Sequence, residues 1–269
     1  MTRHIKFINT LKNRITELFA SGKKDILNIY FTAGFPELEN TVRILKALEK
    51  AGADMVEIGM PYSDPLADGP TIQASSEKAL ANGMTLRKLF EQLEGIREEV
   101  SIPIMLMGYI NPVMQYGVEK FVKKAAEIGI DGVILPDLPF KEYNDLYKTT
   151  FEANNLSNIF LVTPQTSDDR IKTIDTASKG FIYIVSTNST TGNETKDSGD
   201  MTTYFERIQA SELTNPTLIG FNIKDNTSFK NACHYSKGAI IGSAFIKAIE
   251  NTNNLEATIT DFVKKIKIG

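Results

Sequence analysis

The fold is decided by residues 41–60, TVRILKALEKAGADMVEIGM, which join one amphipathic segment to one apolar run. Apolar side chains recur at the spacing of one helix face over Thr41–Ala51, and Gly52 then stops the helix. Met55–Met60 has the composition and the length of a strand that is buried on both faces. A helix that leads into such a strand is the repeating unit of an α/β protein.

The same unit recurs along the chain. Val118–Ile128 repeats the helix pattern with Gly129 as its stop, and Leu255–Ile266 is the last such segment. Ile5–Phe19 precedes the first apolar run and is expected to cover the barrel floor as an extra N-terminal helix. Because eight apolar runs alternate with crossover segments, the sequence predicts a (β/α)8 TIM barrel. The eight predicted strands are Ile26–Thr32, Met55–Met60, Ile104–Gly108, Gly132–Leu135, Ile159–Val162, Phe181–Val185, Thr217–Phe221 and Ala239–Ile241.

A doubly wound open sheet is the alternative fold. It would usually carry a glycine-rich dinucleotide-binding loop after its first strand, and Ala33-Gly34-Phe35-Pro36 does not match that loop. No linker rich in proline, glycine or serine divides the chain, so residues 1–269 are expected to form a single barrel domain.

The composition excludes several classes of function. The net charge is −3 without a basic stripe, which argues against a nucleic-acid partner. Cys233 is the only cysteine and His4 and His234 the only histidines, so a disulfide, a metal cluster or a Ser-His-Asp triad has little to draw on. No apolar run reaches the roughly 18 residues of a membrane span, so a cytoplasmic protein without a membrane partner is expected.

Carboxylates are the first candidates for chemistry. Glu57 lies in the middle of an apolar strand, where an ionised carboxylate is costly unless it is paired or its pKa shifts. It is therefore either a proton-transfer group or one half of a buried ion pair. The loop that follows, Pro61–Gln73, is stiffened by three prolines and carries Asp64 and Asp68. These aspartates either take part in a site or only cap turns.

Two further stretches suit a phosphate or a lid. The last strand ends at Gly242-Ser243 and a helical pattern starts immediately, so backbone amides there can bind an anion, although simple capping is the alternative. The seventh strand leads into Asn222. The loop Ser186–Gly199 is long and polar, as active-site lids and disordered surface loops both are.

Together these features resemble the tryptophan synthase α subunit family. Glu57 followed by Gly59–Gln73, GMPYSDPLADGPTIQ, is similar to the family signature along its whole length. The resemblance extends in order over nearly the entire chain. It implies a (β/α)8 lyase of tryptophan biosynthesis, which splits indole-3-glycerol phosphate into indole and glyceraldehyde 3-phosphate by a retro-aldol reaction. The other matching motifs are Thr32–Pro36, Gly108–Pro112, Leu135–Pro139, Thr190–Gly192 and Gly242–Ala244.

The resemblance also implies roles for single residues. Glu57 matches the catalytic acid–base that protonates C3 of the indole ring. Asp68 matches the carboxylate that holds the indole N–H and stabilises positive charge on the ring. Thr191 matches a lid threonine that closes onto Asp68. No metal is implied. The residues expected to bind substrate are Tyr183, Tyr109, Thr191, Gly192, Asn222, Gly242 and Ser243.

A partner is implied as well. The family works with a β subunit in an α2β2 heterotetramer, whose pyridoxal phosphate is expected in the β subunit, with no cofactor in this chain. The resemblance places Pro61, Asp64 and Asn111 at the partner interface. Asp64 either contacts the partner or only caps the turn before Pro65.

The chain departs from the family pattern at three places. Ser186–Ser189 lacks the usual arginine and glycine, with Thr187 and Ser189 in their stead, so lid closure can differ. Asn222 replaces a glycine; asparagine tolerates left-handed backbone angles, but its β-carbon adds bulk near the phosphate. Phe35 stands where many members have aspartate.

Three alternative functions stay open at this point. They are a lyase that releases indole without a partner, a non-catalytic activator of the β subunit, and another barrel enzyme acting on a phosphosugar. The presence of both Glu57 and Asp68 argues against the activator.

Overall fold

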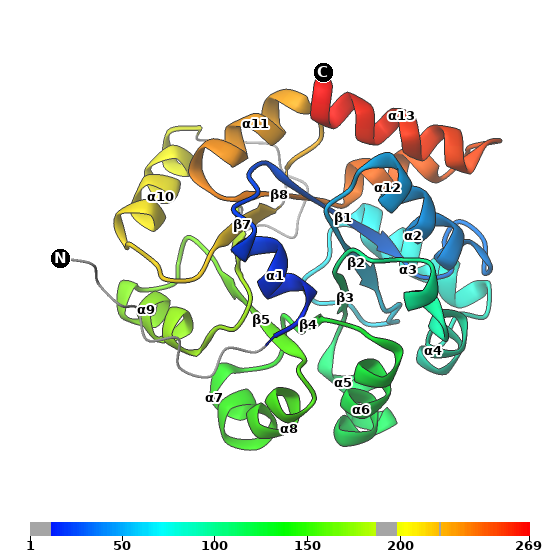
Figure 1. Ribbon diagram of the computed structural model, residues 1–269, viewed down its shortest axis with the longest axis horizontal. Helices are drawn as coiled ribbons and strands as arrows, with labels where there is room; N and C mark the ends of the chain where they lie inside the picture. The colour runs from blue at the N-terminus through cyan, green and yellow to red at the C-terminus, as the bar shows by residue number, and fades with distance from the viewer. Residues whose placement is uncertain (1–11, 187–197, 221) are drawn as a thin grey trace.

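The computed structural model describes residues 12–186, 198–220 and 222–269. Eight parallel strands pair in sequence order, and β1 also pairs with β8, which closes the barrel and excludes the doubly wound sheet (Figure 1). The predicted strand bounds are confirmed to within two residues. Phe221, the expected end of the seventh strand, lies outside the described residues. The strands are β1 Ile26–Thr32, β2 Met55–Gly59, β3 Ile104–Met107, β4 Gly132–Ile134, β5 Ser157–Val162, β6 Ile182–Val185, β7 Thr217–Gly220 and β8 Gly238–Ile241.

Helices surround the barrel and connect its strands (Figure 1). Gly52 and Gly129 end two of them with φ of 99° and 90°, the left-handed conformation that glycine adopts at no steric cost, as the sequence predicts. The α-helices are α1 Arg14–Ala20, α2 Asn40–Ala51, α3 Pro70–Ala81, α4 Leu86–Leu93, α5 Ile110–Tyr116, α6 Val118–Ile128, α7 Phe140–Glu142, α8 Lys148–Ala153, α9 Asp168–Ala177, α10 Ser198–Ala210, α11 Asn226–Tyr235, α12 Ser243–Ile249 and α13 Leu255–Ile268; η1 Ile96–Glu98 is a 3₁₀ turn and η2 Tyr143–Tyr147 a π turn.

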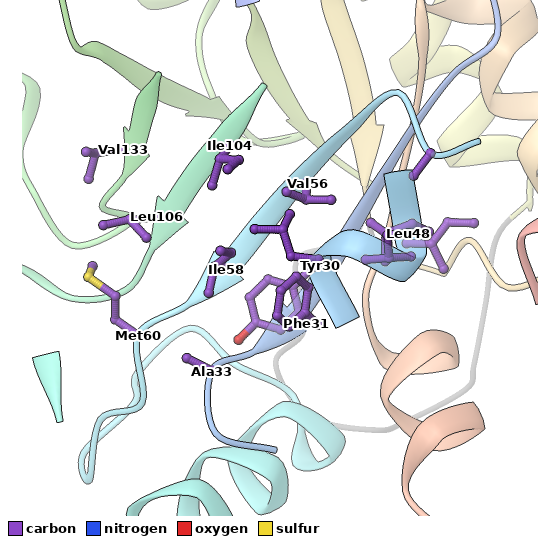
Figure 2. Close-up of a cluster of buried hydrophobic side chains, with 14 of the residues drawn as sticks. Tyr30, Phe31, Ala33, Leu48, Val56, Ile58, Met60, Ile104, Leu106 and Val133 are labelled. Atoms are coloured by element: carbon purple, nitrogen blue, oxygen red, sulfur yellow. The ribbon is translucent and has the colours of Figure 1, made fainter. Parts of the chain in front are cut away.

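The barrel wall separates two apolar layers. Side chains alternate along each strand, so one set fills the barrel and the other packs against the helices. The inner set includes Ile26, Met55 and Ile240, all almost fully buried. Figure 2 shows part of the larger cluster, in which the outward-facing Phe31 and Val56 pack with residues such as Leu48 of α2. Tyr30 joins this cluster from an inward position of β1. Every second residue of a strand therefore points into the barrel, and this alternation decides which polar side chains can reach the interior.

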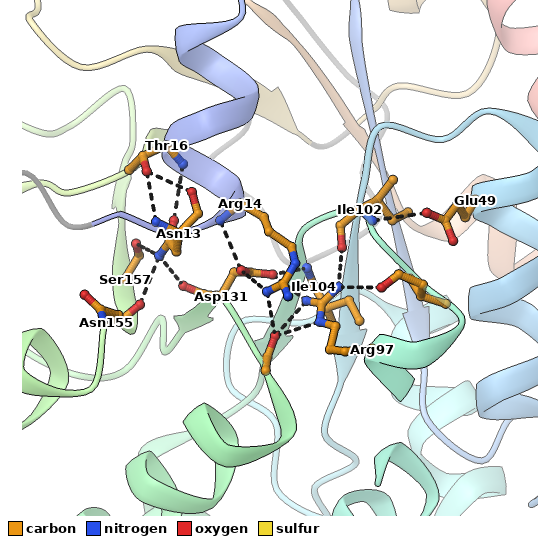
Figure 3. Close-up of polar contacts among 12 residues, drawn as sticks. Asn13, Arg14, Thr16, Glu49, Arg97, Ile102, Ile104, Asp131, Asn155 and Ser157 are labelled. Atoms are coloured by element: carbon orange, nitrogen blue, oxygen red, sulfur yellow. Dashed lines mark hydrogen bonds and ion pairs between the residues drawn. The ribbon is translucent and has the colours of Figure 1, made fainter. Parts of the chain in front are cut away.

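Helix α1 closes the amino-terminal end of the barrel. Ile15 inserts into the inner apolar layer, and the Asn13 side chain caps the helix while donating to the carbonyl oxygens of Asp131 and Asn155 (Figure 3). The buried Asp131 carboxylate accepts from Arg14 at 3.1 Å and from Arg97 at 2.5 Å. The expected floor helix is confirmed from Arg14 on, and the earlier part of Ile5–Phe19 up to residue 11 lies outside the described residues.

With this end closed, the carboxyl ends of the strands are where a substrate can enter, as in other barrels of this type. No helix in the described part of the chain is long and apolar enough to cross a membrane.

Candidate active site at the carboxyl ends of the strands

Glu57 lies inside the barrel on β2 and is fully buried. The Asn28 side-chain amide donates a hydrogen bond of 2.6 Å to its Oε1, whereas its Oε2 has no hydrogen-bond partner among the described residues. Burial raises the pKa of Glu57 to about 8, against the smaller opposing effect of the Asn28 hydrogen bond. No cation pairs with this carboxyl group within the described residues. The geometry therefore favours a protonated acid over a buried ion pair.

Asp68 lies on the loop between β2 and α3, and this loop is held in place by hydrogen bonds. The Tyr109 hydroxyl donates to Asp68 Oδ2 at 3.0 Å and accepts from the backbone amide of Ala67 at 2.9 Å. Gln73 donates to the Asp68 carbonyl oxygen at 2.8 Å. Burial raises the pKa of Asp68, and the Tyr109 hydrogen bond opposes that effect. Asp68 therefore does more than cap a turn, since its side chain is bound to the loop after β3.

Two buried tyrosines lie close to Glu57 and Asp68. Tyr183 on β6, predicted to line the site, and Tyr30 on β1 both have a pKa above the ordinary value, first because of burial and further because Glu57 and Asp68 face them. Neighbouring glycines make room for their hydroxyl groups. A β-carbon at Gly220 would lie 2.2 Å from the Tyr183 hydroxyl oxygen, and one at Gly59 would lie 2.1 Å from that of Tyr30.

The expected phosphate-binding positions are only partly described. Helix α12 begins at Ser243, directly after Gly242, and no side chain caps its first turn. Asn222 has φ of 57°, the left-handed conformation that asparagine tolerates better than most residues. By contrast, the Asp225 side chain caps α11 by accepting from the Ser228 amide, so that helix end is already occupied. Thr191, Gly192, Thr187 and Ser189 lie outside the described residues.

The three residues expected to contact the partner follow β2 and β3. Asp64 and Asn111 are exposed, and Pro61 is half-buried. Asn111, in the first turn of α5, donates to the Tyr62 hydroxyl at 2.9 Å, and this bond joins the start of α5 to the loop after β2. Among the described residues, the exposed apolar side chains include Leu66 on the loop after β2 and Met114 in α5.

Two polar residues of the interior are missing from the sequence-based site. Asn28 and Tyr30 alternate with the outward-facing Ile29 and Phe31 on β1, and both lie beside Glu57. The phase of the strand could have identified them, because Ile26 fixes which positions point inward. No group of His, Cys, Asp or Glu within the described residues could hold a metal ion.

Comparisons with known proteins agree with this geometry. The sequence profile described as "Tryptophan synthase alpha chain" matches residues 17–267. A tryptophan synthase alpha chain from Christiangramia forsetii is 56% identical over 255 residues, which covers 95% of this chain and 98% of the relative. One from Bacteroides fragilis is 48% identical and covers 92% and 94% of the two chains.

Solved structures give the same result. The tryptophan synthase subunit alpha of Legionella pneumophila superimposes with a TM-score of 0.85 at 31% identity, covering 97% of both chains. A tryptophan synthase structure from M. tuberculosis superimposes with a TM-score of 0.83 at 28% identity and covers 95% of this chain. This chain belongs to the tryptophan synthase alpha chain family, and the expected lyase activity on indole-3-glycerol phosphate is confirmed with it.

Proposed function

We propose that Glu57 is the acid–base of indole-3-glycerol phosphate cleavage and that Asp68 holds the indole N–H. The observation that carries the proposal is the difference between the two carboxyl groups. Glu57 is fully buried with a pKa of about 8, whereas Asp68 is half-buried and hydrogen-bonded to Tyr109. Two carboxyl groups in different environments can divide the roles of acid and anion.

The chemistry needs both roles. Glu57 delivers its proton to C3 of the indole ring, and the ring then carries positive charge that extends to its nitrogen. The hydroxyl group on the carbon attached to C3 then gives its proton to the Glu57 carboxylate and becomes the aldehyde carbonyl of glyceraldehyde 3-phosphate. As this C=O bond forms, the bond from C3 to the glycerol phosphate chain breaks, its electrons return to the ring, and indole leaves. An Asp68 carboxylate within reach of the N–H stabilises the charge that develops during protonation. Tyr183, whose hydroxyl lies beside Gly220, borders the space in which the ring would lie.

The phosphate of the substrate is assigned to backbone amides after β7 and β8. Support comes from the uncapped start of α12 at Gly242 and Ser243 and from the left-handed Asn222. Gly242 also lies against the Tyr30 ring, so that a β-carbon there would be 3.4 Å from Tyr30 Cδ1. Thr191 and Gly192 belong to this assignment by sequence resemblance alone.

The family implies a β-subunit partner. We infer further that the chain acts in the cytoplasm as part of an α2β2 heterotetramer whose β subunit holds pyridoxal phosphate. Docking is assigned to the rim at Pro61, Asp64 and Asn111, because these residues follow β2 and β3 at the barrel end that carries Asp68, and Leu66 is exposed beside them. Covering the rim would keep indole, which is apolar, from escaping into water.

The test is indole release by a Glu57→Gln variant. Loss of a general acid typically lowers the rate by about 10²- to 10⁴-fold, and glutamine keeps the shape and the Asn28 hydrogen bond while removing the proton. Glu94→Gln, at an exposed surface ion pair with Lys124, is the matched control and should retain the wild-type rate. Wild-type turnover by a folded Glu57→Gln protein would refute the proposed role.

A further inference from the structure

Asn28 is a buried polar side chain in the barrel interior, with an apolar residue beside it on each neighbouring strand. It lies on β1, pairs in register with Met55 of β2 and Ile240 of β8, and is fully buried. Both of these neighbours belong to the inner apolar layer. An amide in such a place is costly unless its hydrogen bonds are made. Its amide nitrogen donates to Glu57, whereas its Oδ1 has no hydrogen-bond partner among the described residues.

The hydrogen bond distinguishes the two oxygens of Glu57. Asn28 Nδ2 lies 2.6 Å from Oε1, and Oε2 is buried without a described partner. In a neutral carboxylic acid, the carbonyl oxygen accepts and the other oxygen carries the proton. Because an amide nitrogen can only donate, its contact selects Oε1 as the carbonyl oxygen. The proton is thereby directed to Oε2.

We propose that Asn28 is a positioning residue that fixes the Glu57 carboxyl group and leaves Oε2 as the oxygen that transfers the proton. The proposal rests on the proposed role of Glu57. It also explains why the interior keeps an amide at this position. After the proton has left, the same N–H stabilises the carboxylate, which has no cation beside it within the described residues.

The other ionisable groups near Glu57 do not affect the basic limb of the pH profile. Tyr30 and Tyr183 have a pKa raised well above the ordinary value and stay neutral over the range of an enzyme assay. Asp68 acts as an anion, so its titration limits activity on the acid side, whereas loss of the Glu57 proton limits activity on the basic side. Removing the Asn28 hydrogen bond should therefore move the basic limb of the kcat profile to higher pH and leave the acid limb in place.

The experiment measures kcat and KM against pH for Asn28→Leu, which keeps the shape, and Asn28→Ala, which cannot overfill the core. Asn158→Leu is the matched control. Asn158 is also a buried asparagine in a parallel strand with an Oδ1 that has no described partner, but it lies on the opposite phase of β5 from Ile159 of the inner layer. Circular dichroism shows which variants are folded.

Both Asn28 variants are expected to lower kcat by about tenfold or more with little change in KM. They should also move the basic limb to higher pH by about one unit, which corresponds to the loss of one hydrogen bond to a charged group. A basic limb that coincides with wild type, or an equal shift in Asn158→Leu, overturns the proposal. If Glu57→Gln is inactive while the Asn28 variants keep the wild-type profile, only this inference fails. If a folded Glu57→Gln protein is active, the proposed function fails first.

Discussion

Replacing Glu57 by glutamine should make the stability of the protein less dependent on pH. Glutamine has the shape of the protonated glutamic acid and can accept the same hydrogen bond from Asn28, but it does not titrate. In the folded protein the pKa of Glu57 is about 8, raised from an ordinary 4.5 by complete burial. The variant therefore removes a proton-linked term and little else.

The direction in which stability changes with pH follows from the pKa of Glu57 in the folded chain and in the unfolded chain. Below pH 4.5 both the folded and the unfolded chain are protonated at Glu57, and its contribution to stability is fully present. Between 4.5 and about 8 the unfolded chain is ionised while the folded one is not, so wild type loses stability as the pH rises. The loss is about 1.4 kcal/mol for each pH unit, or about 3 kcal/mol from about pH 5.5 to about pH 7.5. Above about 8 the loss levels off.

The measurement is the free energy of unfolding in urea for both proteins at several pH values, followed by far-ultraviolet circular dichroism because the chain has no tryptophan. The free energy of unfolding of Glu57→Gln, relative to that of wild type, should increase steadily as the pH rises through this range. Glu94→Gln, at an exposed carboxylate, should run parallel to wild type. If the difference between Glu57→Gln and wild type stays constant with pH, the carboxyl group is ionised in the folded protein and the assignment of a buried acid is wrong.

Three further outcomes are expected. Asp68→Asn should lower kcat more than it weakens binding of a substrate analogue, because an amide can meet the indole ring but carries no charge; an effect on affinity alone would contradict this. Asp64→Ala should reduce the factor by which the β subunit raises indole release, and a constant factor with lower stability would mean that Asp64 only caps its turn. Asp131→Asn should cost about 3 to 5 kcal/mol of unfolding free energy, because Arg14 and Arg97 lose a buried anion, whereas Asp145→Asn, at an exposed pair, should change stability little.

Much of the fold could be predicted because each strand is short, apolar and bounded by a strong signal. Gly52 and Gly129 end helices in the left-handed conformation, which few other residues adopt, so the strands that follow them were located to within a residue. The contacts that hold α1 at the amino-terminal end of the barrel were harder to predict. The ion pair that fixes α1 joins Arg14 to Asp131, 117 residues away along the chain, and no local pattern shows such a contact.

The two proposed catalytic carboxyl groups could be identified from the sequence because each violates a local rule. Glu57 interrupts an apolar strand, and Asp68 lies on a loop too rich in proline to be flexible. Their partners could not be identified in this way. The phase of β1 marks Asn28 and Tyr30 as inward residues, but an asparagine or a tyrosine breaks no local rule in a strand. That the two residues lie beside Glu57 appears only when β1 is placed beside β2 with Tyr30 opposite Glu57.

The register between β1 and β2 connects stability with chemistry. Asn28 can reach Glu57 only because both occupy inward positions of neighbouring strands, two residues apart in register. A slip of one residue would turn Asn28 toward the helices and leave Glu57 without its donor. The same alternation that buries Ile26 and Met55 inside the barrel therefore fixes the oxygen to which Asn28 donates. A barrel of this kind can raise the pKa of an acid by burial and still orient its proton, provided that one donor is placed on the adjacent strand.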